Sequence, residues 1–138
     1  MSRIVLDTNC LIQSIPQRSQ YHAVWTSFER GTNTLCVSNE IIEEYAEILQ
    51  RLTDAETADY VVKTIINSPF TVLTTPYYHF ELITADPDDN KFVDCAITAN
   101  ARFIVTNDHH YDLLKDIDFP KVDIINIQDF CKALKHNL

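Results

Sequence analysis

Two stretches of this sequence follow the same pattern, an apolar run that ends at an acid within a polar turn. The run at 3–6 is closed by D-T-N at 7–9, and the run at 102–105 is closed by T-N-D at 106–108. Short apolar runs bounded by polar turn residues are typical of buried β-strands. Ligands of open α/β sheets bind at the carboxyl ends of the strands. We therefore expect Asp7 and Asp108 to lie at the functional edge of a sheet.

The segment before the second run is rich in acids. The sequence D-P-D-D at 86–89 is a turn and helix-start signal, because Pro has a fixed φ and an Asp in the first turn can accept backbone N–H groups. Apolar residues then recur at helical spacing from Phe92 to Ala99. Acids thus stand at both ends of a helix and strand unit.

Strand ends that carry acids suit a divalent cation. Hard cations such as Mg²⁺ take oxygen ligands from several chain segments, and Asp7 and Asp108 would supply two of them. A second interpretation is that each Asp only caps the helix that follows it. For either residue taken alone, the two interpretations are equally consistent with the sequence.

The helix expected at 39–52 carries more acid than a cap needs. Its glutamates at 40, 43, 44 and 47 alternate with an apolar stripe, and a solvated acidic face explains most of them. Glu43 and Glu44 lie beside that stripe. We expect one of these two to point inward, towards the acids at the strand ends.

Strands and helices alternate along the chain. This order predicts an α/β fold with a mainly parallel sheet covered on both faces. The expected strands are 3–7, 34–37, 70–73, 102–106 and 122–127, and the expected helices are 8–14, 22–31, 39–52, 55–67, 92–99, 112–115 and 127–136. The segment 74–84 is expected to be a loop or short helix.

Length and composition fit one compact domain, 1–138. The chain has 138 residues, of which 46% are hydrophobic, and no apolar run approaches the roughly 20 residues that span a bilayer. The sequence starts with a strand pattern and not a signal peptide, so we expect a cytoplasmic protein without membrane partners. The four cysteines are scattered in apolar surroundings and are expected to be reduced core residues.

The formal net charge of −9 argues against a broad basic surface for nucleic acid. Converging carboxylates would contribute to this charge, and bound cations would offset their repulsion, so a nuclease is not excluded. A basic segment of a partner protein is an equally good inference. No Ser/His/Asp or Cys/His arrangement supports covalent catalysis.

Four motifs, taken in order, resemble the PIN domain family, which includes the toxins of many prokaryotic toxin–antitoxin pairs. They are V-L-D-T-N at 5–9, Ser38 with E-E-Y at 43–45 and I-L at 48–49, D-P-D-D-N-K-F at 86–92, and V-T-N-D at 105–108. Each motif is weak alone, and their order and spacing make the resemblance specific. It implies a three-layer α/β/α sandwich.

The resemblance also implies a site. Asp7, Glu44, Asp89 and Asp108 match the family's four acids and would hold Mg²⁺ or Mn²⁺, while Thr106 matches its hydroxyl position. Asn9 is the polar neighbour on the first turn. Glu43 competes with Glu44, and Asp86 competes with Asp89; the spacing to Ala96 and Thr106 favours Asp89, with Asp86 as a cap or outer ligand. The bulky H-H-Y at 109–111 departs from the family and raises the question of substrate access.

The activity implied by the resemblance is a metal-dependent endoribonuclease that leaves a 5′-phosphate and a 3′-hydroxyl. The alternative is a catalytically silent PIN-like module that binds RNA or protein. The implied partners are RNA, a small antitoxin with a basic segment, and a second copy of the chain. We expect the homodimer contacts around Trp25 to Phe28 and around Tyr60 to Ile66.

Overall fold

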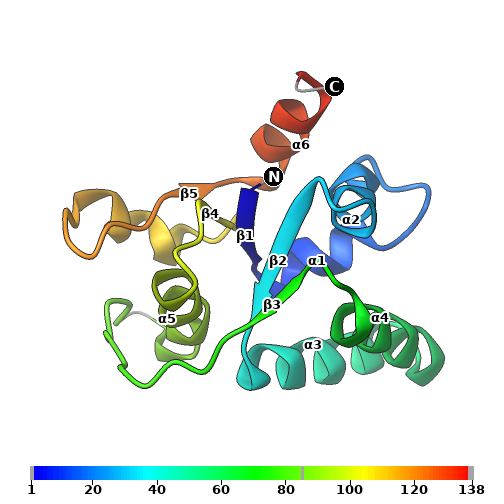
Figure 1. Ribbon diagram of the computed structural model, residues 1–138, viewed down its shortest axis with the longest axis horizontal. Helices are drawn as coiled ribbons and strands as arrows, with labels where there is room; N and C mark the ends of the chain where they lie inside the picture. The colour runs from blue at the N-terminus through cyan, green and yellow to red at the C-terminus, as the bar shows by residue number, and fades with distance from the viewer. Residues whose placement is uncertain (1, 85, 137–138) are drawn as a thin grey trace.

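The computed structural model describes residues 2–84 and 86–136, and its centre is a five-stranded sheet (Figure 1). The strand order is β3-β2-β1-β4-β5, and every neighbouring pair is parallel. The strands are β1 (Ser2–Leu6), β2 (Asn33–Val37), β3 (Thr71–Leu73), β4 (Phe103–Val105) and β5 (Ile124–Ile125). The expected α/β class with a parallel sheet is confirmed.

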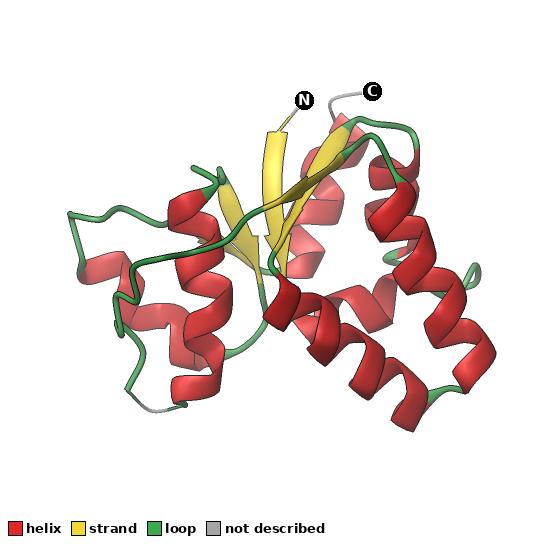
Figure 2. Cartoon of the chain, turned by 60° about the horizontal axis from the view of Figure 1, so that its bottom comes forward, coloured by secondary structure: helices red, strands yellow, loops and turns green. Residues whose placement is uncertain are grey.

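Helices cover both faces of this sheet (Figure 2). Helix α5 packs on β1, β2 and β4, while α2 packs on β2 and contacts α1 and α6; α3 and α4 form a hairpin beside the β3 edge. The helices are α1 (Thr8–Ser14), α2 (His22–Glu29), α3 (Asn39–Leu52), α4 (Ala55–Asn67), α5 (Asn90–Thr98) and α6 (Ile127–His136), with 3₁₀ helices η1 (Pro87–Asp89) and η2 (His109–Asp116).

The predicted element boundaries are largely confirmed where capping signals were clear. The Ser38 hydroxyl accepts a hydrogen bond from the backbone N–H of Ile41 at 3.3 Å and starts α3. Gly31 follows α2 with φ +80°, a conformation that glycine adopts without steric cost. A Cβ at this position would lie 2.5 Å from the ring of Phe70, so the site excludes a side chain.

Two elements near the carboxyl end differ from expectation. The last strand, expected at 122–127, is only Ile124–Ile125, because its partner β4 is three residues long and pairs only Ile104 and Val105 with it. The helix expected at 112–115 is the longer 3₁₀ helix η2, which begins directly after Asp108.

The aromatic residues of α2 belong to the core. Trp25 and Phe28 are buried within this chain, where α2 packs against β2, α1 and α6. The expectation that they supply homodimer contacts is therefore wrong. Tyr45 is also buried, and its hydroxyl donates a 2.5 Å hydrogen bond to the carbonyl of Leu6, which fixes α3 against the end of β1.

The four cysteines are buried and unpaired, as expected. In the part of the chain that the structure describes, no helix combines the length and the apolar character needed to cross a bilayer.

The sheet has a switch point between β1 and β4. From β1 the chain continues outward through β2 and β3 on one side, and later through β4 and β5 on the other. At such a point the connections that leave the two strands diverge, and a crevice forms at their carboxyl ends. Asp7 directly follows β1, and Thr106 directly follows β4, so the fold brings both predicted strand ends to this crevice.

Candidate metal centre

Asp7 lies at the centre of the crevice and is only 8% exposed. Its Oδ1 accepts the backbone N–H of Thr8 at 2.8 Å, and its Oδ2 accepts the Thr106 hydroxyl at 2.8 Å, so the carboxylate joins the ends of β1 and β4. Burial raises the pKa of Asp7, these two hydrogen bonds oppose that shift, and the charges of Asp108 and Glu44 add to it. The protein therefore holds this acid in a position where an additional cation would be favourable.

Thr106 organises the β4 side of the site. Besides donating to Asp7, its hydroxyl oxygen accepts the backbone N–H of Asp108 at 3.1 Å. The Asp108 side chain accepts the backbone N–H of His110 at 2.8 Å and begins η2. Asp108 thus caps a helix, as one interpretation of the sequence expected, and also contributes charge to Asp7. The two interpretations are compatible.

Glu44, and not Glu43, faces the crevice. The Glu44 side chain accepts a short hydrogen bond from the Thr8 hydroxyl through Oε2. Its Oε1 lies 2.8 Å from Nζ of Lys91, a residue near the start of α5. Glu43 is exposed, as are Glu40 and Glu47, which agrees with a solvated acidic face. The register of α3 therefore sends one of its four glutamates inward.

Asp89 stands at the end of η1 with its side chain only 13% exposed. Its buried Oδ2 has no hydrogen-bond partner among the described residues, and the nearest imidazole nitrogen, Nδ1 of His110, is 3.6 Å away. Burial first, and then the charges of Asp7, Asp86 and Asp108, raise the pKa of Asp89 to about 6, with His110 acting in the opposite direction. Among the carboxyl groups of the site, Asp89 would therefore be stabilised most by a nearby positive charge.

Asp86 and Asn9 take peripheral positions. The Asp86 side chain accepts the backbone N–H of Asp88 at 3.2 Å and caps η1. One ligand atom each from Asp86, Asp89 and His110 lie within 4.8 Å of one another. Asn9 is exposed on α1, and the described residues give its side chain no hydrogen bond to the acids. The cap role expected for Asp86 is present, and Asp89 is the more deeply placed of the two competing acids.

Three residues of the region were not assigned a role from the sequence. Lys91 and His110 contact the acids directly. Asp94 is buried on α5, where it accepts hydrogen bonds from Nδ1 of His79 at 3.2 Å and the backbone N–H of Phe80 at 3.1 Å. An acid among the apolar residues 92–96 was a usable signal for Asp94. No comparable pattern marks Lys91, whose main partner Glu44 is distant in the sequence, or the contact of His110 with Asp89 in another element.

The bulk of H-H-Y at 109–111 is accommodated without filling the crevice mouth. Tyr111 is buried in the core, with its hydroxyl 3.5 Å from the carbonyl oxygen of Asp89, and His109 points to solvent. His110 lies between two acids, 3.3 Å from Oδ1 of Asp108 and 3.6 Å from Oδ2 of Asp89. His110 and Tyr111 therefore both contact Asp89, while His109 contacts Asp112.

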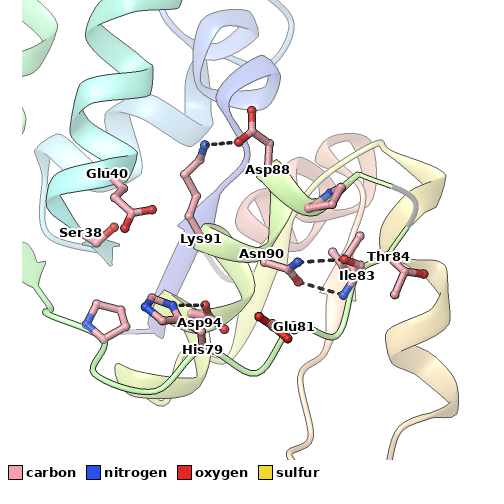
Figure 3. Close-up of a pocket in the computed structure, with 12 residues that line it drawn as sticks. Ser38, Glu40, His79, Glu81, Ile83, Thr84, Asp88, Asn90, Lys91 and Asp94 are labelled. Carbon is pink, nitrogen blue, oxygen red and sulfur yellow. Dashed lines mark hydrogen bonds and ion pairs between the residues drawn. The ribbon is translucent and has the colours of Figure 1, made fainter.

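A cavity of about 530 Å³ lies next to the start of α5 (Figure 3), and Lys91, which contacts Glu44, forms part of its wall. Its wall comes from the start of α3, the loop 74–84 and the first turns of α5, and includes Ser38, His79, Asn90, Lys91 and Asp94. The Asn90 side chain donates a hydrogen bond through Nδ2 to the carbonyl oxygen of Ile83 and accepts one through Oδ1 from the backbone N–H of Ile83, each at 2.8 Å. These two bonds fix the loop against α5. Lys91 and Asp88 reach towards each other at the rim (Figure 3).

These residues fit a divalent cation. The donor set consists of carboxylate oxygens from four segments, the type of ligand that Mg²⁺ and Mn²⁺ prefer. The charges of neighbouring acids raise the pKa of Asp7 and of Asp89, and one buried oxygen of Asp89 has no hydrogen-bond donor among the residues that the structure describes. Both observations describe a site that is short of positive charge.

Comparison with known proteins agrees with this geometry. The fold is shared with VapBC2 from Rickettsia felis bound to a promoter DNA fragment, at 20% identity and a TM-score of 0.60, over 90% of this chain and 98% of that chain. It is shared with DNA-bound VapBC from Salmonella typhimurium at 19% identity and a TM-score of 0.62, over 92% and 99% of the two chains. VapBC-1 from nontypeable Haemophilus influenzae matches at 14% identity and a TM-score of 0.61, over 91% and 98% of the two chains. No curated protein sequence matches the chain.

The sequence itself matches a family profile described as PIN domain over residues 3–110. This range begins in β1, includes α3 and α5, and ends just beyond Asp108, so it contains all four acids of the crevice. The parallel sheet, its switch point and the match over most of the chain all agree, and the chain belongs to the PIN domain family.

Proposed function

We propose that this protein is a metal-dependent endoribonuclease that hydrolyses RNA phosphodiester bonds. The observation that supports the proposal is that Asp7, Glu44, Asp89 and Asp108 converge at the switch point of the sheet. Within the described part of the chain, a buried oxygen of Asp89 also lacks a hydrogen-bond donor. PIN domains of the VapC type are nucleases, which supports a hydrolase in general terms. RNA as substrate and Mg²⁺ or Mn²⁺ as cofactor are the finer parts of the proposal.

In this proposal the four acids hold one or two Mg²⁺ or Mn²⁺ ions. A bound ion of this kind lowers the pKa of water and stabilises charge on phosphoryl oxygens. The chain's own residues orient the ligands: Thr106 fixes Asp7 and the start of η2, and Thr8 fixes Asp7 and Glu44. Such supporting hydrogen bonds hold ligand side chains in one orientation and reduce the entropy lost on binding. Asn9 and Glu43 have no part in this arrangement.

The substitution Asp7→Asn tests the site. We expect it to lower Mg²⁺- or Mn²⁺-dependent cleavage of total RNA by at least about a hundredfold, because it removes the central carboxylate charge. Asp116→Asn, which changes an exposed acid at the end of η2, is the matched control and should cleave as the unchanged protein does. Undiminished cleavage by the Asp7 variant would show that the assigned site is wrong.

The second candidate function is a silent PIN-like module that binds RNA or protein without turnover. The four acids count against it, because a binding module has no need to keep mutually repelling carboxyl groups close together, with Asp7 buried among them. Calorimetric titration with Mn²⁺ separates the two. Saturable binding that Asp7→Asn removes supports the nuclease, and absence of metal binding supports the silent module.

We also propose that the protein is the toxin of a toxin–antitoxin pair acting in the cytoplasm. VapBC complexes, with which it shares the fold, are toxin–antitoxin complexes. With a net charge of −9 and an acidic crevice, this chain suits an antitoxin segment that carries Arg or Lys. If that segment acts by displacing the metal, excess Mg²⁺ should reverse the inhibition of cleavage by an Arg-containing partner peptide; inhibition indifferent to Mg²⁺ contradicts displacement.

A homodimer remains part of the proposal, with only the second of the two expected surfaces, the one on α4, retained. Tyr60 and Ile66 on α4 are 61% and 58% exposed, and Leu52 at the end of α3 is 60% exposed. Exposed apolar side chains of this size mark candidate contact surfaces. Light scattering over a concentration range tests it, and a strictly monomeric mass at tens of micromolar contradicts it.

A further inference from the structure

Lys91 makes an ion pair that differs from the others on the molecule. Its Nζ lies 2.8 Å from Oε1 of Glu44, and the two side chains are only 13% and 24% exposed. The pair between Lys63 and Asp59 on α4 has a similar length, 2.9 Å, yet both of its side chains are largely exposed. An exposed pair interacts weakly because water screens it, whereas a pair withdrawn from water interacts more strongly.

The ammonium group of Lys91 is committed mainly to Glu44. A second carboxylate oxygen, Oδ1 of Asp88, lies farther from Nζ, at 3.8 Å, on a side chain that is 86% exposed. Burial acts to lower the pKa of Lys91, but contact with Glu44 outweighs it, and the net pKa is raised. Lys91 is therefore a fixed positive charge in contact with one of the four acids.

Glu44 has both of its oxygens engaged by the protein. Oε1 accepts from Lys91, and Oε2 accepts from the Thr8 hydroxyl. Thr8 is buried, and its backbone N–H donates to Asp7, so Glu44 is fixed relative to the centre of the site. Asp89 is the opposite case: its buried Oδ2 has no hydrogen-bond partner among the described residues, and the nearby Nδ1 of His110 is 3.6 Å away. A cation that enters the crevice thus finds an unbalanced acid on one side and an already neutralised acid on the other.

We propose that Lys91 is an internal counter-ion that competes with the metal for Glu44, and so sets the metal affinity of the site. A cation that uses Glu44 as a ligand must break the contact between Nζ and Oε1, and the work of breaking it weakens metal binding. The released ammonium group remains at the rim of the cavity beside α5, where Figure 3 shows the Lys91 side chain. This inference rests on the proposed function, since it assumes that the acids bind a metal.

The proposal predicts an effect of unusual sign. Replacing a residue of a metal site normally weakens metal binding, whereas Lys91→Met should tighten Mn²⁺ binding about tenfold, because Glu44 can then bind the ion without first losing its contact with Nζ. Lys91→Arg keeps the charge and should stay within about threefold of the unchanged protein. Lys91→Gln, which retains a hydrogen-bond donor for Glu44, is the second neutral variant in case the Met variant folds poorly.

The experiment is calorimetric titration of the metal-free protein with Mn²⁺ in the absence of RNA. Lys63→Met is the matched control, because it removes the same charge from an exposed ion pair, and it should change the affinity less than about twofold. The double variant Lys91→Met/Glu44→Gln should bind Mn²⁺ as Glu44→Gln alone does, since the competition acts through Glu44. Far-ultraviolet circular dichroism of every variant checks that it is folded.

The outcomes separate this inference from the proposed function. If the unchanged protein shows no Mn²⁺ binding that Asp7→Asn removes, the proposed function fails. If that binding is present, but folded Lys91→Met and Lys91→Gln bind Mn²⁺ no more tightly than the unchanged protein, the proposed competition by Lys91 is wrong. The proposed function then still stands. Tightening that persists in the Glu44→Gln background also overturns it, because the effect of Lys91 would then not act through Glu44.

Discussion

The two sides of the acid crevice differ in how their charge is balanced. On the α3 side, Glu44 receives an ammonium group and a hydroxyl from the protein itself. On the η1 side, Asp89 is buried next to further acids, and one of its oxygens has no donor among the described residues. The same chemical group is therefore stabilised in one position and destabilised in the other.

The two acids therefore make opposite contributions to the stability of the metal-free protein. The Glu44 side resembles an ordinary partly buried ion pair that contributes to the folded state. Asp89 lowers the stability of the metal-free protein, and a cation bound next to it would have the most favourable electrostatic interaction. The predictions that follow test each side separately.

The largest effect is expected on the Asp89 side. Asp89→Asn should weaken Mn²⁺ binding by at least about a hundredfold, because it removes the least balanced carboxylate. The same variant should be more stable than the unchanged protein when metal is absent, since the repulsion from the neighbouring acids disappears. Titration calorimetry and urea unfolding with a chelator measure the two effects.

Asp88→Asn is the control for that variant. Asp88 is the adjacent residue, but its side chain is 86% exposed, so its loss should change neither quantity appreciably. If the two substitutions have equal effects, the burial of Asp89 does not make it different from the exposed Asp88.

The next effect is expected on the Glu44 side, with the opposite sign for stability. Glu44→Gln should lower the free energy of unfolding by about 2 kcal/mol in the absence of metal, because it leaves the Lys91 ammonium group partly buried without its counter-charge. Glu43→Gln, one residue earlier on the exposed face of α3, is the control and should cost less than about 0.5 kcal/mol. If Glu44→Gln stabilises the protein as Asp89→Asn does, the two sides are not different.

Much of the fold was predictable because local signals and periodicity agreed. The bounds of α3 and α4 follow from capping residues Ser38 and Asp54 and from a regular apolar stripe. The short strand β5 was overestimated, because its length depends on pairing with β4 and not on its own composition. The burial of Trp25 and Phe28 also depends on contacts with distant elements, here the packing of α2 against α6 and β2, so the composition of α2 could not predict it.

The site was predictable at its strand ends and less so elsewhere. Asp7 and Asp108 follow apolar runs, so the sequence alone brings them to one edge of a sheet. The choice of Glu44 over Glu43 depends on the rotation of α3 about its axis, which periodicity gives only to within one residue. Lys91 had no local signal, because its partner Glu44 is 47 positions away and comes close only through the packing of α5 against α3.

A smaller effect is expected from the hydroxyl between the two strand ends. Thr106→Val keeps the shape of the side chain but removes the donor to Asp7 and the acceptor for the backbone N–H of Asp108. We expect a loss of about 1–2 kcal/mol in the free energy of unfolding, measured with urea. Thr106→Ser retains both hydrogen bonds and should recover most of that loss, and a Ser variant as unstable as the Val variant would instead assign the effect to packing.

The smallest predicted effect is a dependence of stability on pH that comes from Asp89. Its pKa in the folded protein is raised to about 6 from a reference value of 3.8. The folded state therefore binds this proton more readily than the unfolded state, and the associated stability is present at low pH and lost as the pH rises through 6. In metal-free protein, raising the pH from about 5 to about 7 should cost up to roughly 1 kcal/mol through this group.

Other acids titrate in the same range, so the comparison is made between variants. The pH dependence of the urea midpoint should be less steep in Asp89→Asn than in the unchanged protein, with a chelator present throughout. Saturating Mn²⁺ should reverse the trend in the unchanged protein, because a cation binds only the ionised carboxylate and is released as the pH falls. Identical pH profiles for the two metal-free proteins would mean that Asp89 carries no raised pKa, and the contrast with Glu44 would then depend on the Lys91 contact alone.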